Sequence, residues 1–465
     1  MNSSSRHRLC AALLLVCLCI AAGMCQYVED SIDVGGAWVG SLAYNPEQDE
    51  VWGASWGGNC VFAISCDSNK VVSSLALDRP SYLAHDSAAN KAYVAFKGAD
   101  EDSLAVIDGS THQVVRKLQM PGATMPVWDP VSDRVYVSCQ TTNSVAVVDC
   151  ATDSLLKYIP VGACPIKMYI NTLRRKLYVL NFDDGTVSIV DMATNQVIKT
   201  VDVGGTPNAG YYCRSADKFY SAGAPRQCIV IGGQSDTIVA RITLPGNVEV
   251  LSATGNEDDG LVYLGAYAGS DDYVATVSAE KDSVLASTLI GRAAPYGLAY
   301  FGPSGLLYCA SSGSSQVFVL TGDGTQILTT MQVGDCPVVF AVVPRHNRLY
   351  LGHSNTSYVY VLRDTSAGIA EPQSPRPEFL GVSVAPNPFT QSVAVVWHSP
   401  ARGGDAARVY AQDGRLVRQA QIPAGEYRWV WDGRDSRGKP VRAGIYFCTL
   451  DNGANRISRK IVLTE

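Results

Sequence analysis

Residues 177–207 read LYVLNFDDGTVSIVDMATNQVIKTVDVGGTP and contain three runs rich in β-branched and aromatic residues. Short groups of Asp, Asn, Thr and Gly separate these runs. Runs of this composition bounded by turn residues are typical of β-strands. The segment therefore predicts consecutive short strands joined by tight turns.

A related pattern recurs about every 42 residues through most of the chain. Its marker is an aromatic residue between apolar ones, found at Trp52, Tyr93, Tyr136, Tyr178, Tyr220, Tyr263, Tyr308 and Tyr350. A second β-branched run follows each marker, and a proline precedes the marker in six of the eight units. Eight units of four short strands predict an all-β, eight-bladed β-propeller rather than a helical solenoid.

The N-terminal segment matches a strand that the last unit lacks. VEDSIDVGG at 28–36 corresponds to VIKTVDVGG at 197–205, which is the fourth strand of its own unit, and the strand pattern of the eighth unit ends after Arg363. We expect the N-terminal strand to complete the last blade, because this removes two exposed strand edges. A seven-bladed ring is the alternative, if the least regular unit, 245–290, is an insertion.

Residues 1–25 have the features of a signal peptide. Arg6 and Arg8 precede an apolar stretch at 9–22, and polar residues follow at once. Cys25 leaves lipidation as an alternative. No later segment has about 20 consecutive apolar residues, so we expect no transmembrane helix in the mature protein.

The charge and the cysteines exclude several classes of function. The chain total is −6; residues 1–25 contribute +2 and residues 378–465 contribute +4, so residues 26–377 carry −12, which disfavours nucleic acid as a partner. Ten cysteines lie beyond the signal peptide, nine of them before residue 378, with no Cys-x-x-Cys pair. We expect them to be buried small hydrophobic residues, and we expect no metal and no cofactor.

The pattern L-Y-V-x-N…V-x-I-V-D across Leu177–Pro207 resembles the YVTN family of β-propeller repeats, and the resemblance covers about residues 34–363. It implies the fold but no single activity, because that family includes surface-layer proteins, periplasmic binders and relatives of sugar lactonases.

In propellers, the turns between second and third strands share the usual ligand face with the segments between blades. We expect ligand contacts there from six residues: Trp56, Asp183, Asp184, Tyr267, Tyr296 and His353. The acidic groups at 100–102, 183–184 and 271–272 either form a rim for a cationic ligand or are simply good turn residues. Asp108, Asp149 and Asp191 recur with the repeat, and we expect them to cap the turns that follow.

Signals of catalysis are weak. The chain has no G-x-S-x-G motif and no P-loop. A hydrolase of the sugar-lactonase type would need several convergent polar groups, whereas only His353 and Arg226 can be placed on the ligand face. We predict a non-enzymatic binding or surface-coat module for a protein, peptide or glycan ligand, with that hydrolase as the alternative.

The periodicity changes at Phe379, and short strands there predict a small Ig-like β-sandwich over 379–465. Its motifs resemble the Ig-like domain of flagellar hook-assembly proteins and the C-terminal sorting domain of type IX secretion cargo. The residues that carry the resemblance are Pro386, Asn387, Pro388, Phe389, Trp431, Asp432, Gly433, Gly444, Tyr446 and Lys460.

The resemblance implies an address rather than an activity: recognition by outer-membrane secretion machinery and delivery to the bacterial cell surface or the exterior. An accessory Ig-like module without a sorting role is the alternative. The expected organisation is therefore a signal peptide at 1–25, a propeller at 26–365, a Pro-rich linker at 366–378 and the C-terminal domain at 379–465.

Overall fold

The computed structural model describes residues 26–98, 102–225 and 227–366, and in the C-terminal part 383–385, 389–396, 406–411, 415–423, 428–451 and 456–464. The predicted signal peptide and nearly all of the predicted linker lie outside these residues. The chain forms two compact units, which are described separately below. Among the described residues, no helix has the length and apolar character needed to cross a membrane.

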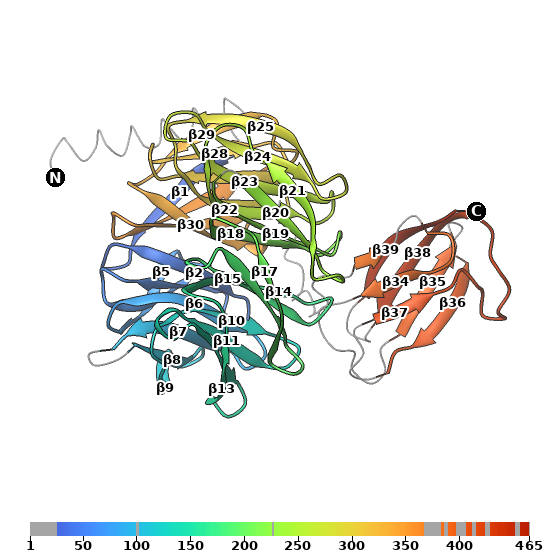
Figure 1. Cartoon of the computed structure of the whole chain (residues 1–465), viewed down its shortest axis with the longest axis horizontal. Coiled ribbons are helices and arrows are strands. Elements are labelled where there is room, and N and C mark those ends of the chain that lie inside the picture. The colour runs from blue at the N-terminus through green and yellow to red at the C-terminus, as the bar shows by residue number, and fades with distance from the viewer. Residues whose placement is uncertain are drawn as a thin grey trace. The chain divides into compact units, whose positions relative to one another are not determined.

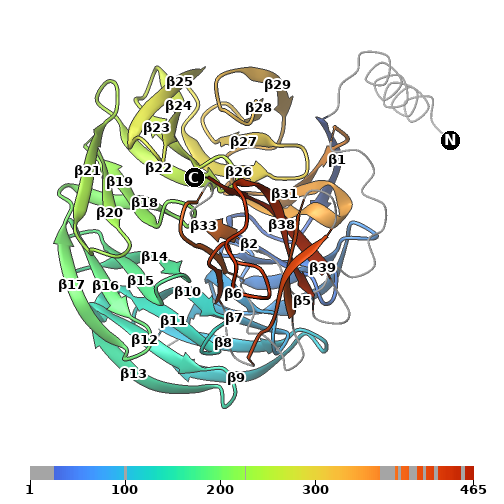
Figure 2. The same cartoon turned by 90° about the vertical axis from the view of Figure 1, so that its right-hand side faces the viewer.

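The first unit contains eight four-stranded antiparallel sheets arranged around a common axis (Figures 1 and 2). From the axis outward, the first four blades are β2 (Val39–Asn45), β3 (Glu50–Ser55), β4 (Cys60–Ser65), β5 (Lys70–Ala76); β6 (Pro80–Asp86), β7 (Lys91–Lys97), β8 (Asp102–Asp108), β9 (Gln113–Gln119); β10 (Ala123–Asp129), β11 (Arg134–Cys139), β12 (Ser144–Asp149), β13 (Ser154–Pro160); and β14 (Pro165–Asn171), β15 (Lys176–Asn181), β16 (Thr186–Asp191), β17 (Gln196–Asp202).

The fifth to seventh blades repeat this order. They are β18 (Thr206–Cys213), β19 (Lys218–Ala224), β20 (Gln227–Gly232), β21 (Ile238–Thr243); β22 (Glu249–Asn256), β23 (Leu261–Tyr267), β24 (Asp272–Ser278), β25 (Ser283–Gly291); and β26 (Pro295–Phe301), β27 (Leu306–Ser311), β28 (Gln316–Leu320), β29 (Ile327–Gln332). Two short 3₁₀ helices, η1 (Gln140–Thr142) and η2 (Pro344–His346), lie in turns.

The eighth blade joins the two ends of the ring. It consists of β30 (Pro337–Val343), β31 (Arg348–His353), β32 (Tyr358–Asp364) and, as its outer strand, β1 (Gln26–Asp33). β1 pairs with β32 from Gln26 opposite Asp364 to Asp33 opposite Tyr358. The predicted eight-bladed ring with closure by the N-terminal strand is confirmed. The seven-bladed alternative is wrong, because residues 249–291 form a complete blade.

The repeat pattern follows from the packing of each sheet between two neighbours. The second and third strands are buried on both faces, as in β3, where all six residues are buried. The outer strands alternate instead between exposed and half-buried residues, as in β5. Near-continuous apolar runs therefore mark the middle strands, and alternating runs mark the outer ones.

The marker aromatic of the repeat joins each blade to the next one. Its ring is buried between two sheets, and in five blades its hydroxyl donates to an Asp or Asn of the following blade. These bonds run from Tyr93 to Asp153 (2.8 Å), Tyr136 to Asn195 (2.8 Å), Tyr220 to Asp282 (3.0 Å), Tyr308 to Asp364 (2.6 Å) and Tyr350 to Asn69 (2.7 Å). The last bond crosses the point of ring closure.

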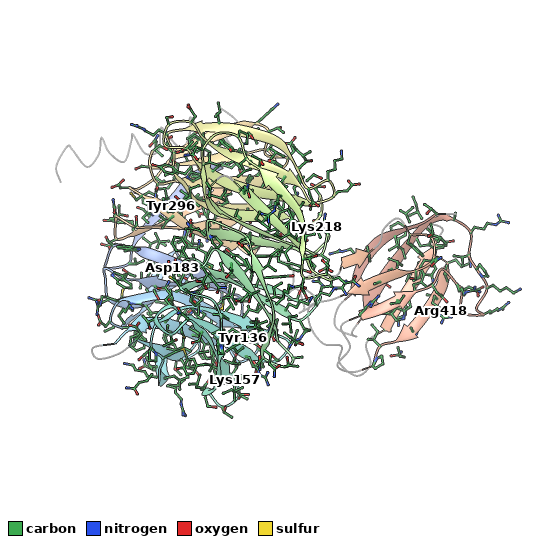
Figure 3. The ribbon with its side chains drawn as sticks, viewed as in Figure 1. Tyr136, Lys157, Asp183, Lys218, Tyr296 and Arg418 are labelled. Atoms are coloured by element: carbon green, nitrogen blue, oxygen red, sulfur yellow. The ribbon has the colours of Figure 1, made fainter. Side chains whose placement is uncertain are left out.

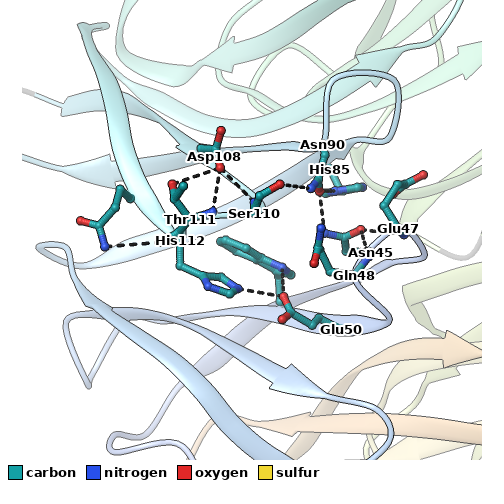
Figure 4. A network of polar contacts seen from close by, with 12 residues as sticks. Asn45, Glu47, Gln48, Glu50, His85, Asn90, Asp108, Ser110, Thr111 and His112 are labelled. Carbon is teal, nitrogen blue, oxygen red and sulfur yellow. Dashed lines mark hydrogen bonds and ion pairs between the residues drawn. The ribbon is translucent and has the colours of Figure 1, made fainter.

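The first blade uses a variant of this contact (Figure 4). Its marker is Trp52, whose indole N–H lies 3.2 Å from Glu50 Oε2. His112 of the second blade stacks on Trp52 at 5.2 Å between centroids and reaches the same carboxylate oxygen at 2.9 Å. Asp108, in the same view, accepts bonds from Ser110 and Thr111, as expected for a turn cap.

The second unit is a small sandwich of two sheets. One sheet has the order β33-β34-β37 and the other β36-β35-β38-β39. The strands are β33 (Ser383–Ala385), β34 (Val393–Val396), β35 (Ala406–Ala411), β36 (Leu416–Gln421), β37 (Arg428–Trp431), β38 (Gly444–Asp451) and β39 (Arg456–Leu463). The predicted fold class is thus confirmed for both parts of the chain.

Candidate functional site

Two sets of loops lie together on one face of the propeller. In several blades a backbone N–H of the turn between the second and third strands donates to the segment that precedes the inner strand. Examples are Trp56 to Trp38 (3.0 Å), Gln140 to Gly122 (2.8 Å), Phe182 to Cys164 (3.0 Å), Ser312 to Ala294 (3.2 Å) and Ser354 to Cys336 (2.9 Å). We call the surface formed by these two sets of loops the turn face.

The residue just before the inner strand has a left-handed backbone in seven of the eight blades. In two blades it is glycine, namely Gly122 and Gly205; in the others it is Trp38 (φ 61°), Arg79 (φ 42°), Cys164 (φ 53°), Ala294 (φ 47°) and Cys336 (φ 53°). Only glycine adopts this conformation freely; a residue with a side chain is destabilised there by about 1–2 kcal/mol. Two blades have glycine here, so the fold does not require a residue with a side chain. The large side chains of Trp38 and Arg79 therefore call for an explanation.

Trp38 and Arg79 both contact Trp56. The ring centroids of Trp38 and Trp56 are 6.2 Å apart, and the Arg79 guanidinium lies 6.0 Å from the Trp56 centroid. Trp38 is 57% exposed, and Trp56 is half-buried. Arg79 also pairs with Asp78 at 3.3 Å. Three loops around the first blade thus bring together an exposed indole, a supporting indole and a guanidinium, which we call the tryptophan cluster.

The other predicted ligand residues are dispersed over the turn face. Figure 3 shows Asp183 and Tyr296 on one side of the propeller and Lys218 on the other. Asp183 and Asp184 are exposed in the turn of the fourth blade, and Asp184 accepts a bond from the backbone N–H of Ala163 at 2.5 Å. Tyr267 and Tyr296 are 40% and 49% exposed, in the sixth and seventh blades. Of the predicted set, only Trp56 belongs to a compact cluster of side chains.

The acidic positions do not form one continuous rim. Asp272 is fully buried and accepts bonds from four backbone N–H groups, two in its own turn and two at Ala293 and Ala294. Burial acts to raise the pKa of Asp272, but these bonds outweigh it and the pKa lies below its ordinary value. Asp272 therefore stabilises its turn, as the alternative interpretation expected. Asp100 and Glu101 lie outside the described residues.

His353 was predicted as an exposed ligand contact, and this placement is wrong. Its side chain is fully buried at the end of β31 and packs against the ring of Tyr360 at 4.8 Å. Nδ1 lies 3.1 Å from the carbonyl oxygen of Tyr358, so Nδ1 carries the proton. Burial lowers the pKa of His353 to about 4, so the imidazole is neutral near pH 7.

We expect His353→Ser to reduce the acid sensitivity of the protein. The folded-state pKa of His353 lies below the unfolded value of 6.5, so the stability that the neutral ring contributes is present above pH 6.5 and is lost as the pH falls towards 4. Over this pH range, the free energy of unfolding of the parent should fall by up to about 3 kcal/mol more than that of the variant. Denaturant unfolding of both proteins between pH 4 and pH 7 measures this difference; equal pH slopes would contradict the assignment.

Two groups of described side chains have the spacing of metal ligands, namely Asp49, Asp67 and His346, and Asp86, Asp133 and Cys150. In the first group, His346 Nε2 lies 2.6 Å from Asp49 and 3.8 Å from Asp67, so a hydrogen bond to Asp49 accounts for the arrangement. In the second, Asp86 accepts bonds from two backbone N–H groups of its own turn. We assign no metal to either group.

The cysteines behave as small hydrophobic residues. None of the ten that lie in the described part of the chain forms a disulfide, and eight of them are buried. Cys164 and Cys336, which occupy equivalent positions on the turn face, are half-buried and unpaired.

In the C-terminal unit, the aromatic residues of the predicted sorting motif build the core. The Trp431 ring contacts Phe389 at 5.6 Å and Tyr446 at 5.1 Å, edge to face. The Trp431 indole N–H donates to the carbonyl oxygen of Arg434, and the Tyr446 hydroxyl donates to that of Arg442. The side chains of these three residues therefore pack in the core of the sandwich.

Two further motif residues follow Trp431. Asp432 is exposed and Gly433 is buried, and both line a groove of about 530 Å³ together with Thr390 and Leu463. Gly433 has a left-handed backbone (φ 67°), and Gly444 begins β38. Pro386, Asn387, Pro388 and the side chain of Lys460 lie outside the described residues.

Sequence reasoning missed Trp38 and Arg79. Both stand directly before an inner strand, in segments that were treated as connectors. The sequence held little signal, because the residue before the repeat proline carries a side chain in every unit, as in Arg79-Pro80, Cys164-Pro165 and Cys336-Pro337. The contacts with Trp56 become visible only in the structure.

The protein is a β-propeller, and its exposed tryptophan cluster lies on the turn face. No family model and no curated protein matches the sequence. Among solved structures, the chain is similar to hydrazine synthase of Kuenenia stuttgartiensis, with 16% identity and a TM-score of 0.51 over 70% of this chain and 96% of the other. At this identity the likeness concerns the fold alone.

Proposed function

We propose that this protein is an exported, non-enzymatic binding module that holds a glycan or peptide ligand on the turn face of its propeller. The tryptophan cluster carries this proposal. Exposed Trp38 is held in a backbone conformation that glycine would adopt without strain; Trp56 contacts it from a second loop, and Arg79 contacts Trp56 from a third. A strained backbone at an exposed residue such as Trp38 is explained if its side chain binds a ligand.

The composition of the cluster suits ligand binding. Trp and Arg are enriched among the residues that contribute most to binding energy, because they combine large apolar area with hydrogen-bond donors. An indole face suits the apolar side of a sugar ring or a peptide side chain, and the guanidinium can donate to hydroxyl or carbonyl groups. The residues 26–377 carry −12, so a cationic or neutral ligand suits this face better than an anionic polymer.

The outer strands favour binding over assembly into a coat. Each of the eight has a β-bulge near its start, and the bulged residue is apolar and exposed in most blades. The bulged residues are Val72, Val115, Leu156, Ile198, Val239, Leu285 and Leu328, with Glu29 in the eighth blade. Bulges disrupt the regular ladder that strand-to-strand association of separate molecules would need.

Support for export and delivery comes from the sequence. The apolar segment at 9–22 has the form of a signal peptide, and the C-terminal motifs resemble type IX sorting domains. The repeats resemble the YVTN family. The sugar-lactonase alternative has less support, because His353 is buried and engaged with a carbonyl group.

Substitutions in the tryptophan cluster test the proposal. We expect Trp56→Ala to weaken binding at least about 30-fold, since truncation of a central anchor costs about 2 kcal/mol or more. Trp38→Gly should also weaken binding without lowering stability, because glycine relieves the left-handed strain at this position. Asp183→Ala is expected to have a smaller effect in the same direction. Titration of ligand into each purified variant measures these changes.

The control is Gln48→Ala, an exposed position in a turn on the opposite face. It should leave binding unchanged. If Gln48→Ala weakens binding and the tryptophan variants do not, the ligand occupies the other face and the proposal fails.

A further inference from the structure

The junction of the fourth and fifth blades contains a cavity of about 120 Å³ that opens on the turn face. One wall is the segment at Val203, Gly204 and Gly205, and the others come from β19 and β20. The backbone N–H groups of Val203 and Gly204 both donate to Gly185, so the acidic turn of the fourth blade borders the cavity.

Ser221 makes this junction different from the others. It directly follows the marker aromatic Tyr220, a position that is apolar or glycine elsewhere. The equivalent residues in the other blades are Gly53, Val94, Val137, Val179, Leu264, Cys309 and Leu351. The fifth blade alone therefore has a hydroxyl group at this position.

Two further departures create the space. Only two residues separate β19 from β20, whereas four separate the second and third strands in each of the other blades. Gly223 stands where other blades have side chains such as Ser55 and His353, and a Cβ there would lie 1.9 Å from the carbonyl oxygen of Thr206. The inter-blade segment thus approaches β19 closely beside the cavity.

The Ser221 hydroxyl faces this cavity without a partner. Ser221 is 2% exposed, and its Oγ has no hydrogen bond within the described part of the chain. Side chains alternate along β19, and Phe219 packs towards Tyr178 and Val203 of the fourth blade, so Ser221 points to the same junction. A buried hydroxyl without a partner is destabilising, and a bound group that forms a hydrogen bond with it can relieve this cost.

We propose that this cavity binds the acetamido group of an N-acetylated sugar. Its described walls are neutral: Val203, Pro207 and Ile229 offer an apolar surface, and Ser221 and Gln227 offer hydrogen-bonding groups. An acetamido group has the matching parts, a methyl for the apolar wall and an amide that pairs with the hydroxyl. None of the described side chains that line the cavity is charged, so a neutral group suits it.

This inference deepens the proposed function, since it names a ligand group for the same face. The cavity lies between the fourth and fifth blades, whereas the tryptophan cluster is formed by segments around the first blade. The two sites share no residue. A substitution in the cavity therefore tests this inference, and a substitution in the tryptophan cluster tests the proposed function.

Saturation-transfer NMR with the full chain and N-acetylglucosamine provides the test, with glucose and glucosamine as comparison ligands. We expect saturation of the acetyl methyl protons, and no comparable signal from glucose or glucosamine. Ser221→Val should abolish the methyl signal, because it removes the hydroxyl and fills the cavity. The variant should fold, since valine is the native residue at this position in three blades.

Ser287→Val, at an exposed strand position in the sixth blade, is the matched control and should leave the signal unchanged. Trp56→Ala should retain the methyl signal, so its loss of binding to a larger ligand would concern the proposed function alone. Absence of a methyl signal from the parent would overturn the inference and leave a water-filled cavity. Persistence of the signal in Ser221→Val, with a melting temperature no lower than that of the parent, would overturn it as well.

Discussion

Deletion of residues 26–33 should lower the free energy of unfolding by about 5 kcal/mol or more. The deletion removes the outer strand of the eighth blade, including buried Ile32, and leaves the edge of β32 without its ladder. It also removes Glu29, which holds the Arg348 guanidinium through Nε at 2.6 Å. Arg348 is 8% exposed, and a buried charge that loses its partner is strongly destabilising. Denaturant unfolding of purified protein measures the effect.

Tyr27→Ser is the control for this deletion. Tyr27 lies in the same strand, but its side chain is 37% exposed. An exposed substitution of this kind should change stability by no more than about 0.5 kcal/mol. A deletion variant that unfolds at the same denaturant concentration as the parent would show that ring closure by β1 contributes nothing.

A chain that ends at Arg376 should cross the inner membrane and accumulate in the periplasm. All eight blades are complete by Asp364, so the propeller needs no strand from the second unit, and the apolar segment at 9–22 is retained. Only the domain that resembles type IX sorting domains is lost. Fractionation of a host with type IX machinery, followed by immunodetection in the periplasmic and surface fractions, measures the distribution.

The complementary protein joins residues 379–465 to an unrelated exported cargo, which should then reach the surface. A variant of this fusion with Asp432→Ala tests the exposed motif residue without removing a core aromatic. Surface delivery of the truncated chain in normal amounts would reduce the C-terminal unit to an accessory module.

The ring could be predicted because its pattern repeats eight times. The markers from Trp52 to Tyr350 recur with the strands, and the match of 28–36 to 197–205 identified the closing strand. The partners of the marker hydroxyls could not be predicted in the same way. Tyr93 and Asp153 are 60 residues apart and meet only because consecutive blades pack face to face.

The site was less predictable than the fold. Trp56 was found because an aromatic residue in a turn has no structural reason to be there. Trp38 was missed because its importance depends on its backbone conformation and its contact with Trp56. His353 was misplaced because the second strand of its blade extends through residue 353, which buries it between neighbouring sheets.

Ser221 is a more instructive case. Its sequence context looks ordinary, since Ser is compatible with a strand, and only the comparison with seven equivalent positions shows that it departs from the repeat. The cavity beside it depends on the length of a neighbouring turn and on Gly223, which no single motif reveals.

The most direct test of ligand binding at the turn face is a glycan and peptide array probed with the full chain and with the double variant Trp38→Gly/Trp56→Ala. We expect the parent to bind a restricted set of ligands and the double variant to lose that set while it remains folded. A parent that binds nothing on the array, or a double variant with the same profile as the parent, would contradict the account.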